Sequence, residues 1–163
     1  MDNNQVELIS IDPGREGYLT FWFKDQETQS WRFESVSMPK INKKEIDYKQ
    51  IYNVFKRHNP KVVVMEQVGM AFKANKKGLV NMGLHQGTLI GLCISLGIHY
   101  EIVHPKTWQS KVLKHVSPSL SPKERSLLAI NRFYPDLSVK NHNQSDSILL
   151  GRYYIEFHLG QSL

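Results

Sequence analysis

The sequence predicts an α/β fold in which a mixed sheet of three antiparallel strands plus two parallel strands is flanked by helices. Three aromatic and β-branched runs follow one another near the N-terminus, separated by short polar stretches, which is typical of antiparallel strands. Further along, a helical pattern lies between two apolar runs, and this arrangement implies a right-handed crossover and a parallel pair. The length of 163 residues fits one domain over 1–163 that buries its own core.

The predicted strands are short apolar runs bounded by polar turn residues. They cover residues 5–12, 17–23, 30–36, 61–66 and 98–103. The run "KVVVME" at 61–66 shows no alternation of polar and apolar residues, which indicates a strand covered on both faces.

The predicted helices show apolar residues at helical spacing or clear end signals. They cover residues 44–58, 78–97, 121–133 and 144–159. At the start of the third, Ser121, Pro122 and Glu124 form a capping box.

A glycine stripe marks the second predicted helix. Gly83, Gly87 and Gly91 recur every four residues, and each costs about 1 kcal/mol of helix propensity relative to Ala. We therefore expect either the sheet or a second subunit to press closely against this stripe.

Positive charge is concentrated in four segments of the chain. Lys and Arg number 21 against 15 Asp and Glu, which gives a net charge of +6. Two of the basic segments contain an aromatic residue, and together the segments favour a nucleic acid as partner. The candidate DNA contacts are Phe72, Lys73, Lys76, Lys77, Lys106, Trp108, Lys111, Lys123 and Arg125.

Cysteine usage and hydropathy indicate the compartment. The single Cys93 lies inside an apolar run, so disulfides play no part and a reducing compartment is favoured. The longest apolar run, residues 89–98, is too short to span a bilayer, and the N-terminus lacks the order of a signal peptide. We expect a cytoplasmic protein with no membrane partner.

Acidic residues end two of the predicted strands. Asp12 and Glu66 both follow apolar runs, and the carboxyl ends of adjacent parallel strands are where ligands collect. For Asp12 the alternative is an ordinary turn role before Pro13 and Gly14. Asp146, in the first turn of the last helix, is a third candidate; its alternative is a capping box with Asn143 as N-cap.

Three carboxylates at one edge of a sheet would repel one another unless cations neutralise them. Oxygen ligands of this kind suit Mg²⁺ or Mn²⁺. Two such ions about 3.5–4 Å apart can activate a water and stabilise the leaving oxygen of a phosphodiester. Acids of this kind among basic segments predict a metal-dependent nuclease that needs no small-molecule cofactor.

The motifs resemble those of RuvC-type Holliday junction resolvases, with the phage and chloroplast members the most similar. The matching motifs, spread over about residues 6–155, are "IDPG", "VVVMEQVGMA", "HQG" on the glycine-striped helix, "VHPKTW", "SPKERS" and "NQSDSILLG". The resemblance implies an RNase H-like fold and a homodimer. It also implies recombination and repair activity in a bacterial or phage-infected cell, by Mg²⁺-dependent paired symmetric nicks in a four-way DNA junction.

The same resemblance implies roles for individual residues. Asp12, Glu66 and Asp146 match the acids that hold two Mg²⁺ ions, for which Mn²⁺ can substitute. Lys106 and Lys111 fall in the basic segment that approaches the scissile phosphates, and Lys111 is also a catalytic candidate. Arg125 falls where a functionally important family lysine sits.

This chain departs from the family pattern just before the last acid. Family members carry a fourth group there, an acid or His, whereas this chain has Asn141, His142 and Asn143. His142 is a candidate ligand or base. Asn141 or Asn143 replaces an Asp in our interpretation, and Asn141 is favoured because "DHN" is the phage-like form. All three are catalytic candidates.

A second departure concerns the loop after Glu66. Bacterial relatives place an aromatic wedge there, whereas this chain has Gly69 at that position and Phe72 three residues later. We expect Phe72 to stack in the junction; the alternative is that it packs within the domain. For the dimer interface, the glycine-striped helix and the aromatic antiparallel edge both remain open.

Three other functions are consistent with parts of the sequence. One is a junction-binding protein without nuclease activity, to which the Asn-rich window points. Another is an RNase H-like enzyme that acts on RNA–DNA hybrids. The third is a sugar kinase or actin-like ATPase, because "DPGREG" distantly resembles a phosphate loop, but that fold needs two such domains and 163 residues are too few.

Overall fold

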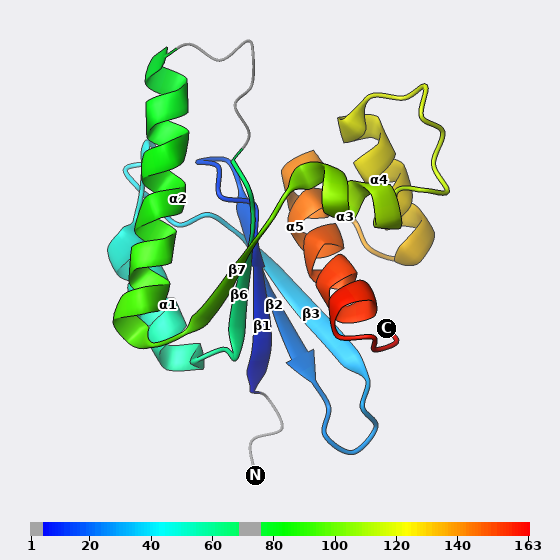
Figure 1. Ribbon diagram of the computed structural model, residues 1–163, viewed down its shortest axis with the longest axis horizontal. Helices are drawn as coiled ribbons and strands as arrows, with labels where there is room; N and C mark the ends of the chain where they lie inside the picture. Colours follow the sequence, from blue (N-terminus) through cyan, green and yellow to red (C-terminus); the bar gives the residue numbers. More distant parts are fainter. Residues whose placement is uncertain (1–4, 69–75) are drawn as a thin grey trace.

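A five-stranded sheet lies between two layers of helices (Figure 1) in the computed structural model, which describes residues 5–68 and 76–163, the side chains of 76 and 77 excepted. The strands run in the order β3-β2-β1-β6-β7, with antiparallel pairing from β3 to β1 and parallel pairing from β1 to β7. Their bounds are β1 (Val6–Ile11), β2 (Tyr18–Lys24), β3 (Trp31–Ser37), β6 (Val62–Glu66) and β7 (His99–Val103). The predicted mixed sheet is confirmed.

Each face of the sheet is covered by its own set of helices (Figure 1). One face carries α1 (Tyr48–His58) and α2 (Lys76–Leu96), and the other carries α3 (Pro105–Val112), α4 (Pro122–Phe133) and α5 (His142–Tyr153), which continues into the π-helical turn η1 (Tyr154–His158). The short elements α3, β4 (Lys40–Ile41) and β5 (Glu45–Ile46) were not expected. These elements are too short for apolar residues to recur at a spacing that would reveal a helix or a strand.

Helix boundaries follow the capping side chains. The capping box of Ser121 and Glu124 is present as predicted. The first helix begins later than expected, because Asp47 caps it by accepting a hydrogen bond from the backbone N–H of Gln50. The predicted Asn143 cap is wrong: Asn141 caps α5 by accepting from the N–H of Gln144.

Helix α5 is fixed to the sheet by buried polar contacts. Ser10 Oγ donates to the carbonyl oxygen of Ser147 at 2.7 Å and accepts from Trp22 Nε1 at 2.9 Å, while the hydroxyls of Thr20 and Ser147 lie 2.8 Å apart. A Cβ on Gly151 would lie 2.1 Å from Trp22 Nε1, so only glycine permits this approach. The contacts hold the middle of α5 against β1, next to Asp146, which lies after the first turn of the helix and not within it as predicted.

The glycine stripe of α2 faces away from the sheet. Leu89 and Cys93 are fully buried, whereas no atom from the described residues outside the helix lies within 4 Å of a Cβ built on Gly83, Gly87 or Gly91. The expectation that the sheet presses on the stripe is therefore wrong, because the core is filled from the opposite side of the helix. The second-subunit alternative stays a prediction.

The exposed side of α2 is unusually apolar. Val80, Leu84 and Ile94 are 69%, 62% and 64% exposed. Residues Gly78–Leu96 are long and apolar enough to cross a bilayer by length and composition, which the ten-residue apolar run at 89–98 did not suggest. Only 11% of that window is buried in the protein, so this surface needs a partner or another apolar environment.

Candidate active site

Asp12 and Glu66 arrive at neighbouring positions of the sheet. Ile11, the last residue of β1, pairs with Met65 in the parallel register of β1 and β6, and each acid is the next residue along its strand. Both therefore lie at the carboxyl edge of the central parallel pair, as predicted from the crossover. Asp146 lies one helical turn into α5, which the polar contacts described above hold against β1.

The turn after β1 fixes the side chain of Asp12 at the end of the strand. Asp12 Oδ1 accepts a hydrogen bond from the backbone N–H of Gly14 at 3.3 Å, and the N–H of Gly17 donates to the Gly14 carbonyl oxygen at 2.8 Å. A Cβ on Gly17 would lie 2.0 Å from the carbonyl oxygen of Asp12, so the turn requires glycine at this position. The turn role and the site role of Asp12 are thus compatible.

The three carboxyl groups share one electrostatic environment. Burial raises the pKa of Asp12 to about 6, of Glu66 to about 7 and of Asp146 to about 7. The charges of Asp146 and Asp12 further raise the pKa of Glu66, and the charge of Asp12 further raises that of Asp146. Each acid therefore lies within range of the charge of the others, as the sequence predicted.

The donor set fits a hard divalent cation. Buried carboxylates with raised pKa values carry charge that their surroundings do not compensate, and oxygen-only ligands suit Mg²⁺ or Mn²⁺. Among residues 5–68 and 76–163, no three Asp, Glu, His or Cys side chains stand close enough to form a complete metal-binding group as they are. The assignment of Asp12, Glu66 and Asp146 as the residues that would hold a cation stays a prediction.

Trp108 has a different position from the one expected. It was a candidate for DNA stacking, but its ring is fully buried under α3, so that expectation is wrong. Its Nε1 instead donates to Glu66 Oε2 at 2.7 Å, which lowers the pKa of Glu66 against the effect of burial. Trp108 is therefore a positioning residue for the second acid.

Replacing Trp108 by Phe tests this positioning role. Loss of a hydrogen bond to a buried carboxylate should destabilise the fold by about 2 kcal/mol, lowering Tm by ~4–8 °C. Nuclease activity should fall ~10–100-fold, as is typical when a partner that orients a metal ligand is lost. The matched control is Trp31→Phe on β3, which removes a hydrogen bond from the indole of Trp31 to the side chain of Gln161. An activity loss as large in the control would contradict the assignment.

The three residues before the last acid have distinct positions. Asn141 Oδ1 accepts from the N–H of Gln144 at 3.1 Å, whereas Asn143 Nδ2 donates to the carbonyl oxygen of Glu16 at 3.0 Å. His142 is half-buried, and burial together with the charge of Lys123 lowers its pKa. A neutral imidazole at neutral pH suits the predicted role as ligand or base.

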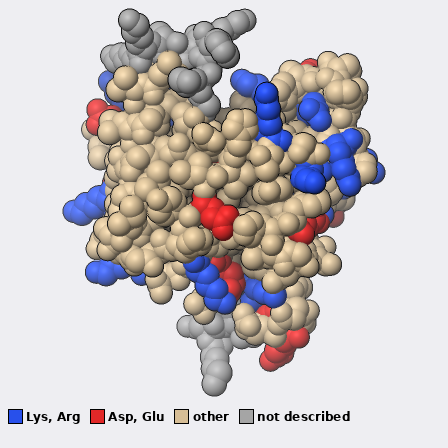
Figure 2. Space-filling model, viewed as in Figure 1, with Lys and Arg blue, Asp and Glu red and all other residues tan. Residues whose placement is uncertain are grey.

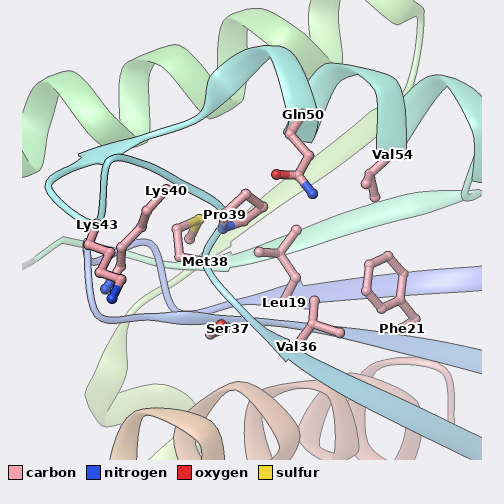
Figure 3. A pocket seen from close by; sticks show the side chains of 10 residues that line it. All are labelled: Leu19, Phe21, Val36, Ser37, Met38, Pro39, Lys40, Lys43, Gln50 and Val54. Carbon is pink, nitrogen blue, oxygen red and sulfur yellow. The ribbon is translucent and has the colours of Figure 1, made fainter.

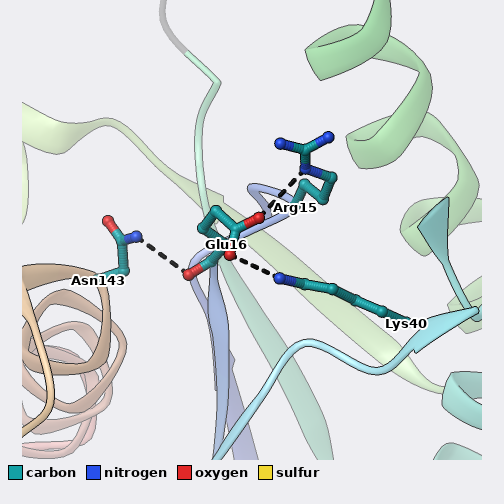
Figure 4. A network of polar contacts seen from close by, with 4 residues as sticks. All are labelled: Arg15, Glu16, Lys40 and Asn143. Carbon is teal, nitrogen blue, oxygen red and sulfur yellow. Dashed lines mark hydrogen bonds and ion pairs between the residues drawn. The ribbon is translucent and has the colours of Figure 1, made fainter. Parts of the chain in front are cut away.

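Asn143 belongs to a polar network at the edge of the site (Figure 4). Glu16, whose carbonyl oxygen it contacts, pairs through its carboxylate with Arg15 at 3.2 Å and with Lys40 at 2.6 Å. The network ties the first turn of α5 to the turn that carries Asp12. Asn143 thus holds two parts of the site together.

Basic side chains gather over α3 and α4 (Figure 2). Lys106, Lys111 and Lys123 are exposed, and the charge of Lys123 acts on both Asp146 and His142. Arg125 is half-buried, and its Nη2 donates to the carbonyl oxygen of Leu113 at 2.9 Å, so it links α4 to the end of α3. DNA contact by these four residues stays a prediction.

The remaining candidate DNA contacts lie at the start of α2 and before it. Phe72 and Lys73 are outside the described residues. Lys76 and Lys77 open α2, but their side chains are not described.

Two supporting residues were not expected from the sequence. Ser126 Oγ donates to Asp146 Oδ1 at 2.5 Å, which lowers the pKa of Asp146. Gln86 Nε2 donates to the carbonyl oxygen of Glu66 at 3.0 Å and ties α2 to the end of β6. The only signals were the placement of Ser126 in "SPKERS" and of Gln86 in "HQG".

The architecture around the site is shared with solved structures. Thermus thermophilus RuvC in complex with a Holliday junction substrate superposes with a TM-score of 0.61 at 14% identity, covering 90% of this chain and 93% of that one. The fold is that of the RuvC-type resolvases. The yeast mitochondrial Holliday junction resolvase gives a TM-score of 0.56 at 14% identity, covering 93% of this chain and 78% of that one. No protein-family model and no curated protein matches the sequence itself.

A viral resolvase shares the same architecture. The fowlpox virus resolvase, solved with substrate Holliday junction DNA, gives a TM-score of 0.52 at 18% identity and covers 93% of this chain and 98% of that one. The predicted fold class, three antiparallel strands plus two parallel strands flanked by helices, is confirmed, and these resolvases share the fold.

The raised pKa values predict a metal- and pH-dependent stability. Folded pKa values above the ordinary ones mean that the stability contribution of these acids is present below about pH 4 and lost as pH rises through 6–7. In EDTA at pH 8, Asp146→Asn should therefore stabilise the protein by about 2 kcal/mol, or ~4–8 °C in Tm. At pH 5 the gain should be much smaller.

Mg²⁺ should raise the stability of the unaltered protein, as the Asp146→Asn substitution does. We expect it to raise the Tm of the unaltered protein at pH 8 and to leave that of Asp146→Asn nearly unchanged. Thermal unfolding of both proteins at both pH values, with and without Mg²⁺, gives the effect of the substitution, of pH and of the cation on Tm. Equal Mg²⁺ shifts in the two proteins would contradict the metal assignment of Asp146.

Proposed function

We propose that this chain is a metal-dependent, structure-specific endonuclease that resolves four-way DNA junctions by paired symmetric nicks. The observation that carries the proposal is the position of three half-buried carboxyls: Asp12 and Glu66 follow paired residues at the ends of β1 and β6, and Asp146 of α5 lies within range of their charge. It is supported by the fold shared with resolvases solved with junction DNA. This makes recombination or repair intermediates the substrate class.

The residues of the chain divide the work between binding and chemistry. Asp12, Glu66 and Asp146 would hold Mg²⁺, or Mn²⁺ in its place; two such ions supply Lewis-acid assistance to the hydrolysis of a phosphodiester. Trp108 and Ser126 orient two of the acids through hydrogen bonds at 2.7 and 2.5 Å.

Basic residues around the acids would hold the substrate. Lys106, Lys111 and Lys123 are exposed on α3 and α4 and would bind the phosphates of the junction arms. His142 would take up a proton at its imidazole near the scissile bond, since burial favours its neutral form.

A homodimer is part of the proposal, because two symmetric nicks need two sites. The apolar side of α2 is the better of the two surfaces considered. Leu84, Gly87, Gly91 and Ile94 follow one another at spacings of three and four residues, and the glycines leave room for a second helix to approach.

The antiparallel edge is a poorer dimer surface than its sequence suggested. Phe33 of β3 turns inward and packs against Trp22 and Tyr134, with ring centroids 4.8 and 5.0 Å apart. On its other side the edge is hollowed by a groove of about 630 Å³ between β3 and α1 (Figure 3), floored by side chains such as Leu19 and Phe21. A flat apolar surface is therefore missing there.

Placing a charge in the stripe tests the interface. Gly87→Arg should convert a dimer to a monomer in sedimentation analysis, because the guanidinium would occupy the space that the second helix needs. Its Tm at low concentration should not fall, since position 87 is exposed and Arg has a higher helix propensity than Gly. Exposed Asn53→Arg on α1 is the control. A Gly87→Arg protein that stays dimeric, or an unaltered protein that partitions into lipid vesicles as a monomer, would contradict the α2 interface.

Substrate competition tests the function itself. We expect cleavage in Mg²⁺ of a synthetic four-way junction and no cleavage of matched duplex. Unlabelled junction should compete, whereas an RNA–DNA hybrid should not. Tight junction binding without nicks, even in Mn²⁺, would identify a binding protein instead, and preferred cleavage of the hybrid would identify a different nuclease.

A further inference from the structure

A pocket with apolar and charged walls opens on the side of α1 and α2. Its volume is about 380 Å³, and its walls come from the β1–β2 turn, β5, α1 and α2. The charged and aromatic side chains that decide its chemistry are Arg15, Lys44, Glu45, Tyr48 and His85, so two cations face one carboxylate. We name it the Arg15–His85 pocket.

Two connections place this pocket next to the site. Arg15 lies three residues after Asp12 in the turn that follows β1. His85 directly precedes Gln86, whose side chain donates to the carbonyl oxygen of Glu66 at 3.0 Å. The pocket therefore adjoins both strands whose ends carry the acids.

The pocket and the exposed lysines flank the acids from opposite faces of the sheet. Helices α3 and α4, which carry Lys106, Lys111 and Lys123, cover one face, and α1 and α2 cover the other (Figure 1). A DNA strand that runs from these lysines across the acids reaches the pocket next. A nucleotide of the strand that is cut would then be its occupant.

The cations of the pocket suit a backbone phosphate. The Arg15 side chain is 58% exposed and pairs with Glu16 at 3.2 Å, an exposed contact that a phosphate can replace at little cost. Lys44 adds a second exposed cation at the opening. Phosphate contacts from such residues position a strand without reading its sequence.

The inner wall of the pocket suits a base. Tyr48 Oη and His85 Nδ1 are hydrogen-bonded, and their rings lie 6.2 Å apart, so together they form an aromatic wall. Burial and the charge of Arg15 lower the pKa of His85, which leaves its imidazole neutral. Aromatic walls next to cations are the composition of sites that hold single-stranded nucleotides.

We propose that the Arg15–His85 pocket receives one unstacked nucleotide of the cleaved strand, next to the scissile phosphate. Arg15 and Lys44 hold its phosphate, and Tyr48 and His85 hold its base. Asn81, which also lines the pocket, offers an amide to the base edge, so the pocket sets a sequence preference beside the nick. This inference rests on the proposed function, because it requires branched DNA as the substrate.

A fluorescent base tests the proposal. 2-Aminopurine is placed in turn at each position flanking the nick of a four-way junction, and the junction is bound to the unaltered protein in EDTA, where no hydrolysis is expected. We expect fluorescence to rise at one position, where the base leaves the stack. In Arg15→Gln and His85→Gln the rise should be lost, and kcat/KM in Mg²⁺ should fall about 10-fold.

Matched controls come from the other end of the sheet. Arg57 lies at the end of α1 and His99 begins β7, and both are exposed. Arg57→Gln and His99→Gln should leave the fluorescence and kcat/KM unchanged, and Tm should show that all four variants are folded. Because Arg15 is exposed, its variant reports on the pocket even if the His85 variant is unstable.

The outcomes separate this inference from the proposed function. Junction binding with no responding position, or with the same response in the Arg15 and His85 variants, would overturn the pocket assignment alone. Absence of selective junction binding by the unaltered protein would overturn the proposed function and the pocket assignment with it.

Discussion

Asp12→Asn should reduce single-turnover cleavage of a four-way junction by at least ~100-fold, because loss of a metal ligand should exceed the loss of a partner that only orients one. Dissociation constants for the junction should stay within about 3-fold, since phosphate contacts dominate affinity. The amide oxygen can still accept the hydrogen bond from Gly14, so the turn should persist. Quench-flow cleavage and a binding titration on the same preparation measure both quantities.

The control for this substitution is Asp136→Asn, which makes the same change at an exposed position after α4. It should leave both quantities unchanged. Cleavage by Asp12→Asn at the rate of the unaltered protein would remove Asp12 from the site.

Asn141→Asp should raise the cleavage rate by ~10-fold or more, by supplying the carboxylate that the family pattern has ahead of the last acid. The structure explains why the change is tolerated: Asn141 is the N-cap of α5, and Asp caps a helix equally well. One carboxylate oxygen would keep the bond to Gln144, and the other would be available to a cation. Single-turnover rates in Mg²⁺ measure the gain.

Asn143→Asp is the matched comparison. The amide of Asn143 donates to the carbonyl oxygen of Glu16, and a carboxylate there would face that oxygen without a proton to share. We expect a loss of about 1 kcal/mol in stability and no gain in rate. Equal rates for Asn141→Asp and the unaltered protein would show that Asn141 does not replace an acid.

The sheet could be predicted because its signals are local and repeated. Apolar runs marked all five strands, and the helix between β1 and β6 made the pair parallel, which in turn placed Asp12 beside Glu66. The short elements β4, β5 and α3 could not be predicted in this way, because two to eight residues do not establish a period.

The support of the site depends on contacts between distant segments. The bond from Trp108 to Glu66 joins residues 42 positions apart, and that from Ser10 to Ser147 joins residues 137 positions apart. Neither has a local pattern. The basic neighbours of Trp108 predict a DNA contact, yet α3 buries the ring and exposes the lysines beside it.

The most direct test of the central claim maps nicks on all four strands of one junction. A junction with a different label on each strand is cleaved in a single turnover in Mg²⁺, and the products are sized. The account predicts paired nicks in two opposed strands, at symmetric positions, which Asp12→Asn abolishes. Nicks confined to one strand, or equal cutting of the duplex arms, would contradict it.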